Sequence, residues 1–176
     1  DAGVSLLKPF VYRKRVYEGF KQADPSVDLK YGPNITDWPQ MIPLTDGLIL
    51  KLAAVITDPV TTTDELIPSG DTSSYRSNPL KLAEFTLSRK DPDYVPKAKA
   101  FACLEQERRG WADGKPLASE LKELFRAAAA VTGETAEKII GVTGLGSAIF
   151  AVKPGDGSAR EQAASCQKVL GGWANI

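Results

Sequence analysis

A serine, an arginine and a glutamate follow a glycine turn near the carboxyl end of the sequence. An apolar stretch ends at Val152, and Ser158, Arg160 and Glu161 then begin a helical pattern. The Ser-x-x-Glu spacing is that of a capping box, which predicts Ser158 as the N-cap of the helix. The free N–H groups and the dipole of such a helix start attract anions, and Arg160 adds donors that suit a carboxylate or a phosphate. We therefore predict an anion site here. The alternative is a capped helix whose arginine is only solvated.

A second polar segment covers residues 57–79 and carries many hydroxyl and carboxylate side chains. It is longer than an ordinary connection, and long loops in compact domains are often functional. We predict that this segment contributes Asp64 and Arg76 to a cleft. The alternative is a solvated loop that is held by local turns of Ser, Thr and Asp side chains.

The composition limits the chemistry that this chain can do alone. The 176 residues include no His and only two Cys, with 22 basic and 22 acidic side chains. These counts exclude a histidine-containing catalytic triad and histidine-ligated zinc, and two thiolates cannot supply the four ligands of an iron–sulfur cluster. The balanced charge argues against nucleic-acid binding, and no stretch is apolar for long enough to span a membrane. The two cysteines fit free thiols in a reducing cytoplasm.

The elements that would position these residues are a mixture of helices and strands, which predicts an α/β fold. Residues 1–45 are rich in Pro and aromatic residues and are expected to be an extended linker, with 27–31 alternating like an edge strand. The apolar run 48–56 predicts a buried strand. Further patterns predict a helix beginning at Pro79 and extending to Leu87, helices over 97–109, 116–131 and 158–170, and strands over 139–142 and 148–152.

Taken together and in this order, the two polar segments resemble motifs of the carboxy-terminal swivelling domain of the aconitase superfamily. Residues 157–163, Gly-Ser-Ala-Arg-Glu-Gln-Ala, are similar to the family motif Gly-Ser-Ser-Arg-Glu-His-Ala. Residues 62–67, Thr-Thr-Asp-Glu-Leu-Ile, are similar to Thr-Thr-Asp-His-Ile-Ser, and Arg76 follows the Asp by twelve residues, as it does in the family. Residues 31–35 resemble the linker before this domain in bacterial members. The bacterial aconitase-like hydratases are the branch that the chain resembles most.

The resemblance covers about residues 24–80 and 139–176. It implies an interdomain linker over 1–45 and a β/β/α-type swivelling domain over 46–176, partial at its carboxyl end and with a helical insertion at about 81–138. The implied activity is that of a hydro-lyase, which moves water across a carbon–carbon bond of a di- or tricarboxylic hydroxy acid. The [4Fe–4S] cluster and the remaining domains would belong to a part of the protein outside this chain, so the 176 residues alone are expected to be inactive.

The resemblance also implies a role for each matching residue. Ser158 would be the base that removes a carbon-bound proton, and Asp64 would position acid–base groups of another domain. The residues implied to bind the small carboxylic-acid substrate are Arg76 and Arg160, which would hold its carboxylates, and Thr63 and Ala159, which would line the site. No residue of this chain is expected to be a metal ligand.

The motifs depart from the family pattern at two hydroxyl positions. Ala159 and Ile67 stand where the family has Ser, and the motif histidines are replaced by Glu65 and Gln162. The loss of two hydroxyls indicates an acid other than citrate or a partly degenerate site. The competing hypothesis is therefore a non-catalytic module that binds anions or partners and is derived from the same domain.

Overall fold

The structure is a computed structural model that describes residues 24–28 and 30–176. The chain divides into two units, Asp1–Gly32 and Pro33–Ile176. In the first unit the amide and hydroxyl of Ser26 donate hydrogen bonds of 2.9 and 2.6 Å to Oδ1 of Asp24, which closes a turn. The described residues of 27–31 are not in a strand, which differs from the prediction, and Leu29 lies outside the described residues. Residues 33–45 contain neither helix nor strand, and the remainder of the predicted linker, 1–23, also lies outside the described part.

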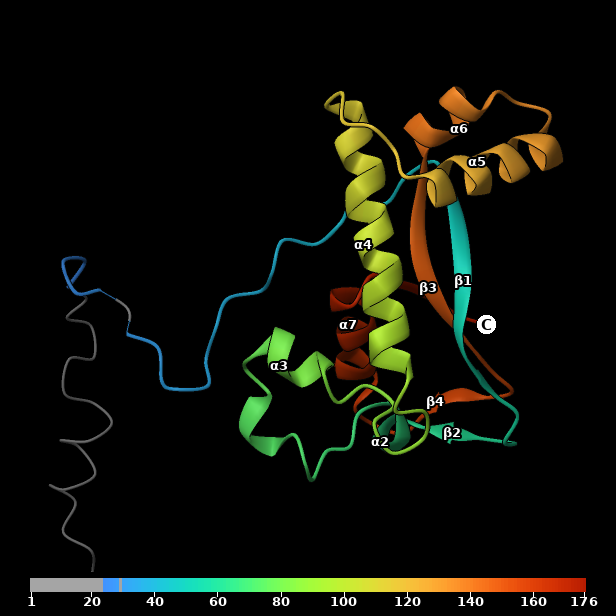
Figure 1. Ribbon diagram of the computed structural model, residues 1–176. Helices are drawn as coiled ribbons and strands as arrows, with labels where there is room; N and C mark the ends of the chain where they lie inside the picture. The colour runs from blue at the N-terminus through green and yellow to red at the C-terminus, as the bar shows by residue number, and fades with distance from the viewer. Residues whose placement is uncertain (1–23, 29) are drawn as a thin grey trace, which may run out of the picture. The chain divides into compact units, whose positions relative to one another are not determined.

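A three-stranded parallel sheet forms the centre of the second unit, with the strand order β1-β3-β5. The strands are β1 (Gly47–Ile56), β3 (Thr143–Ala151) and β5 (Gly172–Asn175). Two helices, α4 (Tyr94–Ala112) and α7 (Arg160–Val169), pack against this sheet (Figure 1). The structure therefore confirms a mixed α/β architecture with a parallel sheet. β1 is an edge strand of this sheet, and its side chains Leu48, Leu50, Leu52 and Val55 are 36–60% exposed, so the prediction of a buried strand is wrong although the strand itself is present.

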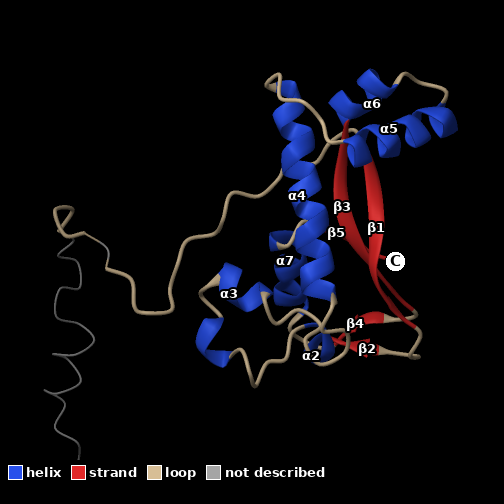
Figure 2. Ribbon diagram, viewed as in Figure 1, coloured by secondary structure: helices blue, strands red, loops and turns tan. Residues whose placement is uncertain are grey.

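A second, very short sheet lies beyond the ends of β1 and β3 (Figure 2). It pairs β2 (Thr61–Thr62) with β4 (Pro154–Asp156) in parallel, so that Thr61 is opposite Pro154 and Thr62 is opposite Asp156. The helix α2 (Thr63–Leu66) and the 3-10 helix η1 (Ser73–Tyr75) follow β2 directly. Residues 57–79 are therefore more regular than the predicted loop.

The remaining helices are α3 (Pro79–Ala83), α5 (Ser119–Thr132) and α6 (Ala136–Val142). One core cluster joins α3, α4 and α7 to the sheet and contains Leu82, Tyr94, Ile149 and Cys166. A second joins α4, α5 and α6 and contains Phe101, Leu121, Phe125 and Ile140. Because α4 contributes to both clusters, the helices within residues 81–138 share the core of the sheet.

Two element predictions are wrong for local reasons. Residues 139–142 end α6 and are not a strand, because the Thr135 side chain accepts a hydrogen bond from the Lys138 amide, 3.3 Å, and starts a helix there. The α3 helix ends at Ala83 and does not reach Leu87, which has φ 55° and leaves the right-handed helical region. The predictions for α4, α5 and α7 agree with the structure to within a few residues. In the described part of the chain, no helix has the length and apolar character needed to cross a membrane.

Candidate functional site

The pairing of β2 with β4 brings the two polar segments of the sequence together. Gly157, directly after β4, has φ 141° and lies against Thr63 at the start of α2. A Cβ at position 157 would overlap Oγ1 of Thr63, so the two chain segments can approach this closely only because residue 157 is glycine.

A cleft of about 490 Å³ lies between these segments. It is lined by most of the residues predicted from sequence, namely Thr63, Asp64, Arg76, Ser158 and Ala159. The exception is Arg160, whose side chain is exposed beside the cleft and whose Nε donates a 2.8 Å hydrogen bond to the Gly157 carbonyl. That bond braces the glycine turn, so the structure gives Arg160 a contact with the backbone of the site rather than a place in its lining.

Arg76 is a side chain that is available to bind an anion. It follows η1 as its C-cap, it is exposed, and its guanidinium makes no hydrogen bond or ion pair with any residue that the structure describes. The guanidinium fork can bind a carboxylate through two parallel hydrogen bonds. Within the lining of the cleft, Arg76 can therefore bind a carboxylate without giving up an existing partner.

The helix start at α7 differs from the predicted capping box. Ala159, with φ −83° and ψ 45°, is the N-cap, and no side chain in the described part of the chain accepts a hydrogen bond from the first turn. The turn at Gly157 places Ser158 outside the helix, so the prediction of Ser158 as N-cap is wrong. The first-turn N–H groups thus lack a side-chain acceptor, which leaves them able to bind an anion. The Ser158 hydroxyl is exposed on the lining of the same cleft.

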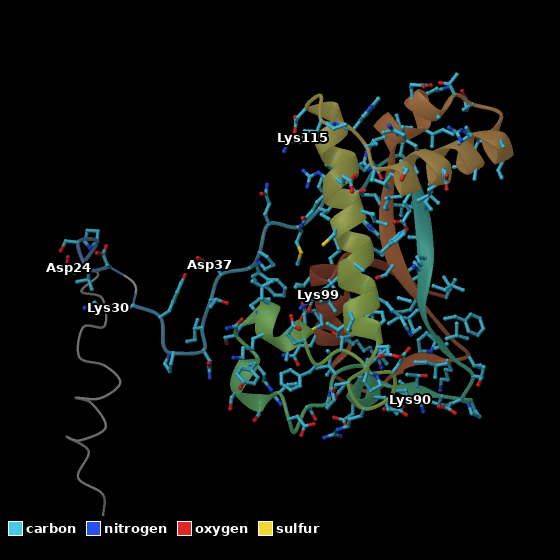
Figure 3. The ribbon with its side chains drawn as sticks, viewed as in Figure 1. Asp24, Lys30, Asp37, Lys90, Lys99 and Lys115 are labelled. Atoms are coloured by element: carbon cyan, nitrogen blue, oxygen red, sulfur yellow. The ribbon has the colours of Figure 1, made fainter. Side chains whose placement is uncertain are left out.

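The capping box of this site lies in α2 instead. The Glu65 amide donates to Oγ1 of Thr62 at 3.2 Å, and the Thr62 amide donates to Oε2 of Glu65 at 2.7 Å. Glu65 also forms an ion pair of 3.2 Å with Lys90, which contacts Asp58 as well. Figure 3 labels Lys90 at the end of the unit where α2 and β2 lie. The Thr62 amide, followed by Lys90, lowers the pKa of Glu65 below its usual value. Glu65 therefore caps and anchors α2.

Asp64 is held in a fixed, ionised state. One carboxylate oxygen accepts hydrogen bonds from the amide and hydroxyl of Ser69 at 2.8 and 2.7 Å, and the other lies 3.5 Å from Nη1 of Arg89. The hydrogen bonds from Ser69 lower the pKa of Asp64, and the charge of Arg89 adds to the effect. Arg89 is itself fixed by Asp71 at 2.8 Å. Asp64 is therefore an oriented anion at neutral pH rather than a proton donor.

Sequence reasoning missed Asp156 and Ser69 in the cleft, and it gave no binding role to the motif residues Gln162 and Ile67. Asp156 and Gln162 contribute a carboxylate and an amide to the lining, and the buried Ile67 contributes an apolar side chain. Asp156 lies next to the predicted Gly-Ser motif, and Gln162 lies one helical turn after Ser158, so their sequence positions could have indicated them. The contact of Arg89 with Asp64 joins separate segments and has no comparable local signal, whereas Ser69 lies in the same polar segment as Asp64.

The described residues contain no group of three or more His, Cys, Asp or Glu side chains that could hold a metal ion. The two thiols lie in different environments, Cys103 exposed on α4 and Cys166 buried on α7. Burial, followed by the charge of Glu161, raises the pKa of Cys166 to about 12, so it is a protonated core residue at neutral pH. An iron–sulfur cluster does not fit the part of this chain that the structure describes.

No protein family, curated protein or solved structure matches the chain.

Proposed function

We propose that this chain is the swivelling domain of an aconitase-like hydro-lyase and supplies the base and a carboxylate clamp for a di- or tricarboxylic hydroxy acid. The observation that carries the proposal is the shared cleft, where Ser158 of one polar segment meets Asp64 and Arg76 of the other, and where Arg76 is unpaired among the described residues. The sequence resemblance assigns these same residues to one active site. The free thiols also suit a cytoplasmic protein, which is part of the proposal.

Each residue has a physical role in this reaction. Arg76 binds a substrate carboxylate, because its guanidinium has no other partner among the described residues. Ser158 acts as an alkoxide, whose own proton has been lost to solvent, and its Oγ accepts the carbon-bound proton to become the hydroxyl again. The uncapped first turn of α7 stabilises the negative charge of the alkoxide. Asp64, kept ionised by Ser69, orients donor groups that another domain contributes. Thr63 and Ala159 shape the wall beside Ser158.

The [4Fe–4S] cluster that the resemblance implies would be bound by other domains of a longer protein. There it would bind the hydroxyl and a carboxylate of the substrate. The charges of the cleft fit such a division of the site. Asp64 and Asp156 line it beside Arg76, so the cleft has no strong positive field of its own and needs further cationic groups to hold a multiply charged acid. This chain alone is therefore proposed to be inactive.

Ile67 and Ala159 favour the second candidate, a non-catalytic module that binds anions or partners. Ile67 is 3% exposed and apolar at a position where the resembling motif carries a hydroxyl. Such a module would use Arg76 and the start of α7 but would have no need of Ser158. The two candidates therefore differ in the role of one hydroxyl group.

The experiment uses the longer protein with its cluster reconstituted and measures the hydration of unsaturated di- and tricarboxylic acids. Ser158→Ala should lower kcat by about 10²–10⁴-fold, the range for loss of a general base. Arg76→Gln should raise KM by about 10–100-fold, because it removes a charge-assisted pair of hydrogen bonds. Ser119→Ala and Arg126→Gln on α5 are matched controls and should change neither value. An inactive wild-type protein with an intact cluster would support the binding module.

A further inference from the structure

The extended segment 33–45 is fixed to the rest of its unit at three points. The Thr36 amide donates to the Ser77 carbonyl at 2.9 Å, Lys168 Nζ donates to the Ile42 carbonyl at 2.9 Å, and Oγ1 of Thr45 accepts from the Gly144 amide at 2.9 Å. The first of these bonds is made to the residue next to Arg76. The segment is therefore anchored beside the cleft.

A second, smaller pocket of about 50 Å³ lies at this anchor. Trp38 of the extended segment forms part of its wall, together with side chains of α3 and α7 that include Leu82 and Val169. Arg76 and Gln162 line both this pocket and the 490 Å³ cleft. Arg76 and Gln162 thus border both spaces, and Trp38 lines the smaller pocket together with Arg76.

We propose that Trp38 is a positioning residue for Arg76, which keeps the guanidinium directed into the cleft to bind a carboxylate of a di- or tricarboxylic acid. This inference rests on the proposed function. An unpaired arginine loses side-chain entropy when a ligand immobilises it. A wall behind the side chain reduces that loss before the ligand arrives, which tightens binding.

The exposure of Trp38 agrees with this role. Its side chain is 56% exposed, so the segment does not use it chiefly as a core anchor. The bond between Thr36 and Ser77 fixes the backbone two residues before Trp38 against the residue after Arg76. Binding of a carboxylate by Arg76 should consequently alter the surroundings of the indole, and loss of the indole should weaken binding.

The probe is propane-1,2,3-tricarboxylate, added to the 176-residue chain while NMR follows the backbone amides of Ala159 and Gln162 and the indole N–H signals. Trp38→Phe assigns the Trp38 indole signal. We expect the cleft amides and the Trp38 indole to shift with one common Kd, and the indole of Trp111, at the far end of α4, to remain unchanged. Arg76→Gln should abolish both responses.

Variants then separate positioning from folding. Trp38→Ala should raise Kd at least about fivefold, Trp38→Phe should restore most of the affinity because it keeps an aromatic wall, and Trp111→Phe is the matched control. The inference is overturned, with the proposed function intact, when the cleft amides of Trp38→Ala respond with the wild-type Kd or when the Trp38 indole does not respond in the wild-type chain. If no cleft amide of the isolated chain responds to the probe, the inference is overturned as well, whereas the proposed function is tested separately in the longer protein.

Discussion

Gly157 lies so close to Thr63 that a methyl group on its Cα would overlap the threonine Oγ1. This contact is what allows the end of β4 and the start of α2 to form one cleft. The close approach depends on backbone geometry as well as space, because Gly157 has φ 141°, a conformation that L side chains rarely adopt.

Replacing Gly157 by Ala should therefore open the cleft and destabilise the fold. We expect a loss of about 2–4 kcal/mol, which combines unfavourable φ with steric overlap. Gly155→Ala is the matched control, because Gly155, in β4, also has a positive φ of 79° but has nothing within 4 Å of an added Cβ. Urea unfolding should show the Gly157 variant to be less stable than the Gly155 variant by at least about 1 kcal/mol. Equal losses of stability in the two variants would show that the close contact with Thr63 does not affect the free energy of unfolding.

A buried ion pair, Glu105 with Arg108, joins α4 to the start of β3. The Glu105 carboxylate accepts from Nε and Nη2 of Arg108 at 2.7 Å each and from the Leu145 amide at 2.8 Å, and Arg108 Nη1 donates to the Ile140 carbonyl at 2.7 Å. Glu105→Ala leaves a buried guanidinium without its partner and should cost about 3–5 kcal/mol in the free energy of unfolding.

The double variant Glu105→Met/Arg108→Leu removes both charges and tests whether the cost comes from the unpaired cation. It should recover more than half of the stability that Glu105→Ala loses, because no charge then remains buried. Chemical denaturation of the three proteins provides the comparison. A double variant as unstable as the single one would show that the hydrogen bonds to Leu145 and Ile140 are what matter.

The anchoring of α2 should depend on pH at the acidic end of the scale. The pKa values of Asp64 and Glu65 lie below their usual 3.8 and 4.5, because Ser69 and Thr62 respectively donate hydrogen bonds to the ionised carboxylates. A lowered pKa in the folded state means that the stabilisation is complete above the usual value and is lost as pH falls through the lowered one. NMR titration of the Ser69 and Thr62 amides should therefore show their hydrogen bonds intact at pH 5.

Ser69→Ala should move the titration of Asp64 upward towards 3.8 and leave that of Glu65 unchanged. The control is Ser88→Ala, which removes a hydroxyl that makes no hydrogen bond with the described residues. If Asp64 in the wild-type chain titrates above 3.8, the account of its ionised state is wrong.

The two cysteines should differ sharply in reactivity. Cys103 is exposed, whereas Cys166 is 1% exposed and has a pKa of about 12. At pH 8 only roughly one Cys166 in 10⁴ would be a thiolate, the form that attacks a disulfide reagent. In the native chain one cysteine should react quickly with the disulfide reagent, and the second should react only on unfolding. The Cys103→Ser variant should therefore show no fast phase of the reaction. Rapid modification of Cys166 in the native Cys103→Ser variant would contradict the buried position.

The sequence allowed the main elements to be predicted where one apolar pattern determined them. The apolar run of β1 and the helical periodicity of α4, α5 and α7 are local sequence patterns, and tertiary packing did not override the secondary structure that they predict. The strand predicted over 139–142 failed because a short apolar run is ambiguous, and here the Thr135 cap decided for a helix. The capping box predicted at Ser158 does not form, because the turn at Gly157 moves the N-cap of α7 to Ala159, and the capping box at Thr62 is a separate one that belongs to α2.

The cleft was predictable only in part. The motif residues Asp64, Arg76 and Ser158 were identified from sequence, and the structure places them around one space. The residues that hold these side chains in position were not predictable. Arg89 and Lys90 reach α2 from a turn after α3, and Trp38 reaches the same end of the unit from the extended segment. Such contacts depend on how distant segments pack, which no spacing within a motif records.

The most direct test of the central claim follows the proton that Ser158 is proposed to remove. The longer protein, with its cluster reconstituted, is given a hydroxy-acid substrate deuterated at the carbon that loses its proton, and mass spectrometry measures the washout of deuterium into water. Ser158→Ala should slow washout by about 10²–10⁴-fold while substrate binding and the Ser119→Ala control stay at the wild-type level. Washout at the wild-type rate in Ser158→Ala would contradict the assignment of Ser158 as the base and with it the proposed function of this cleft.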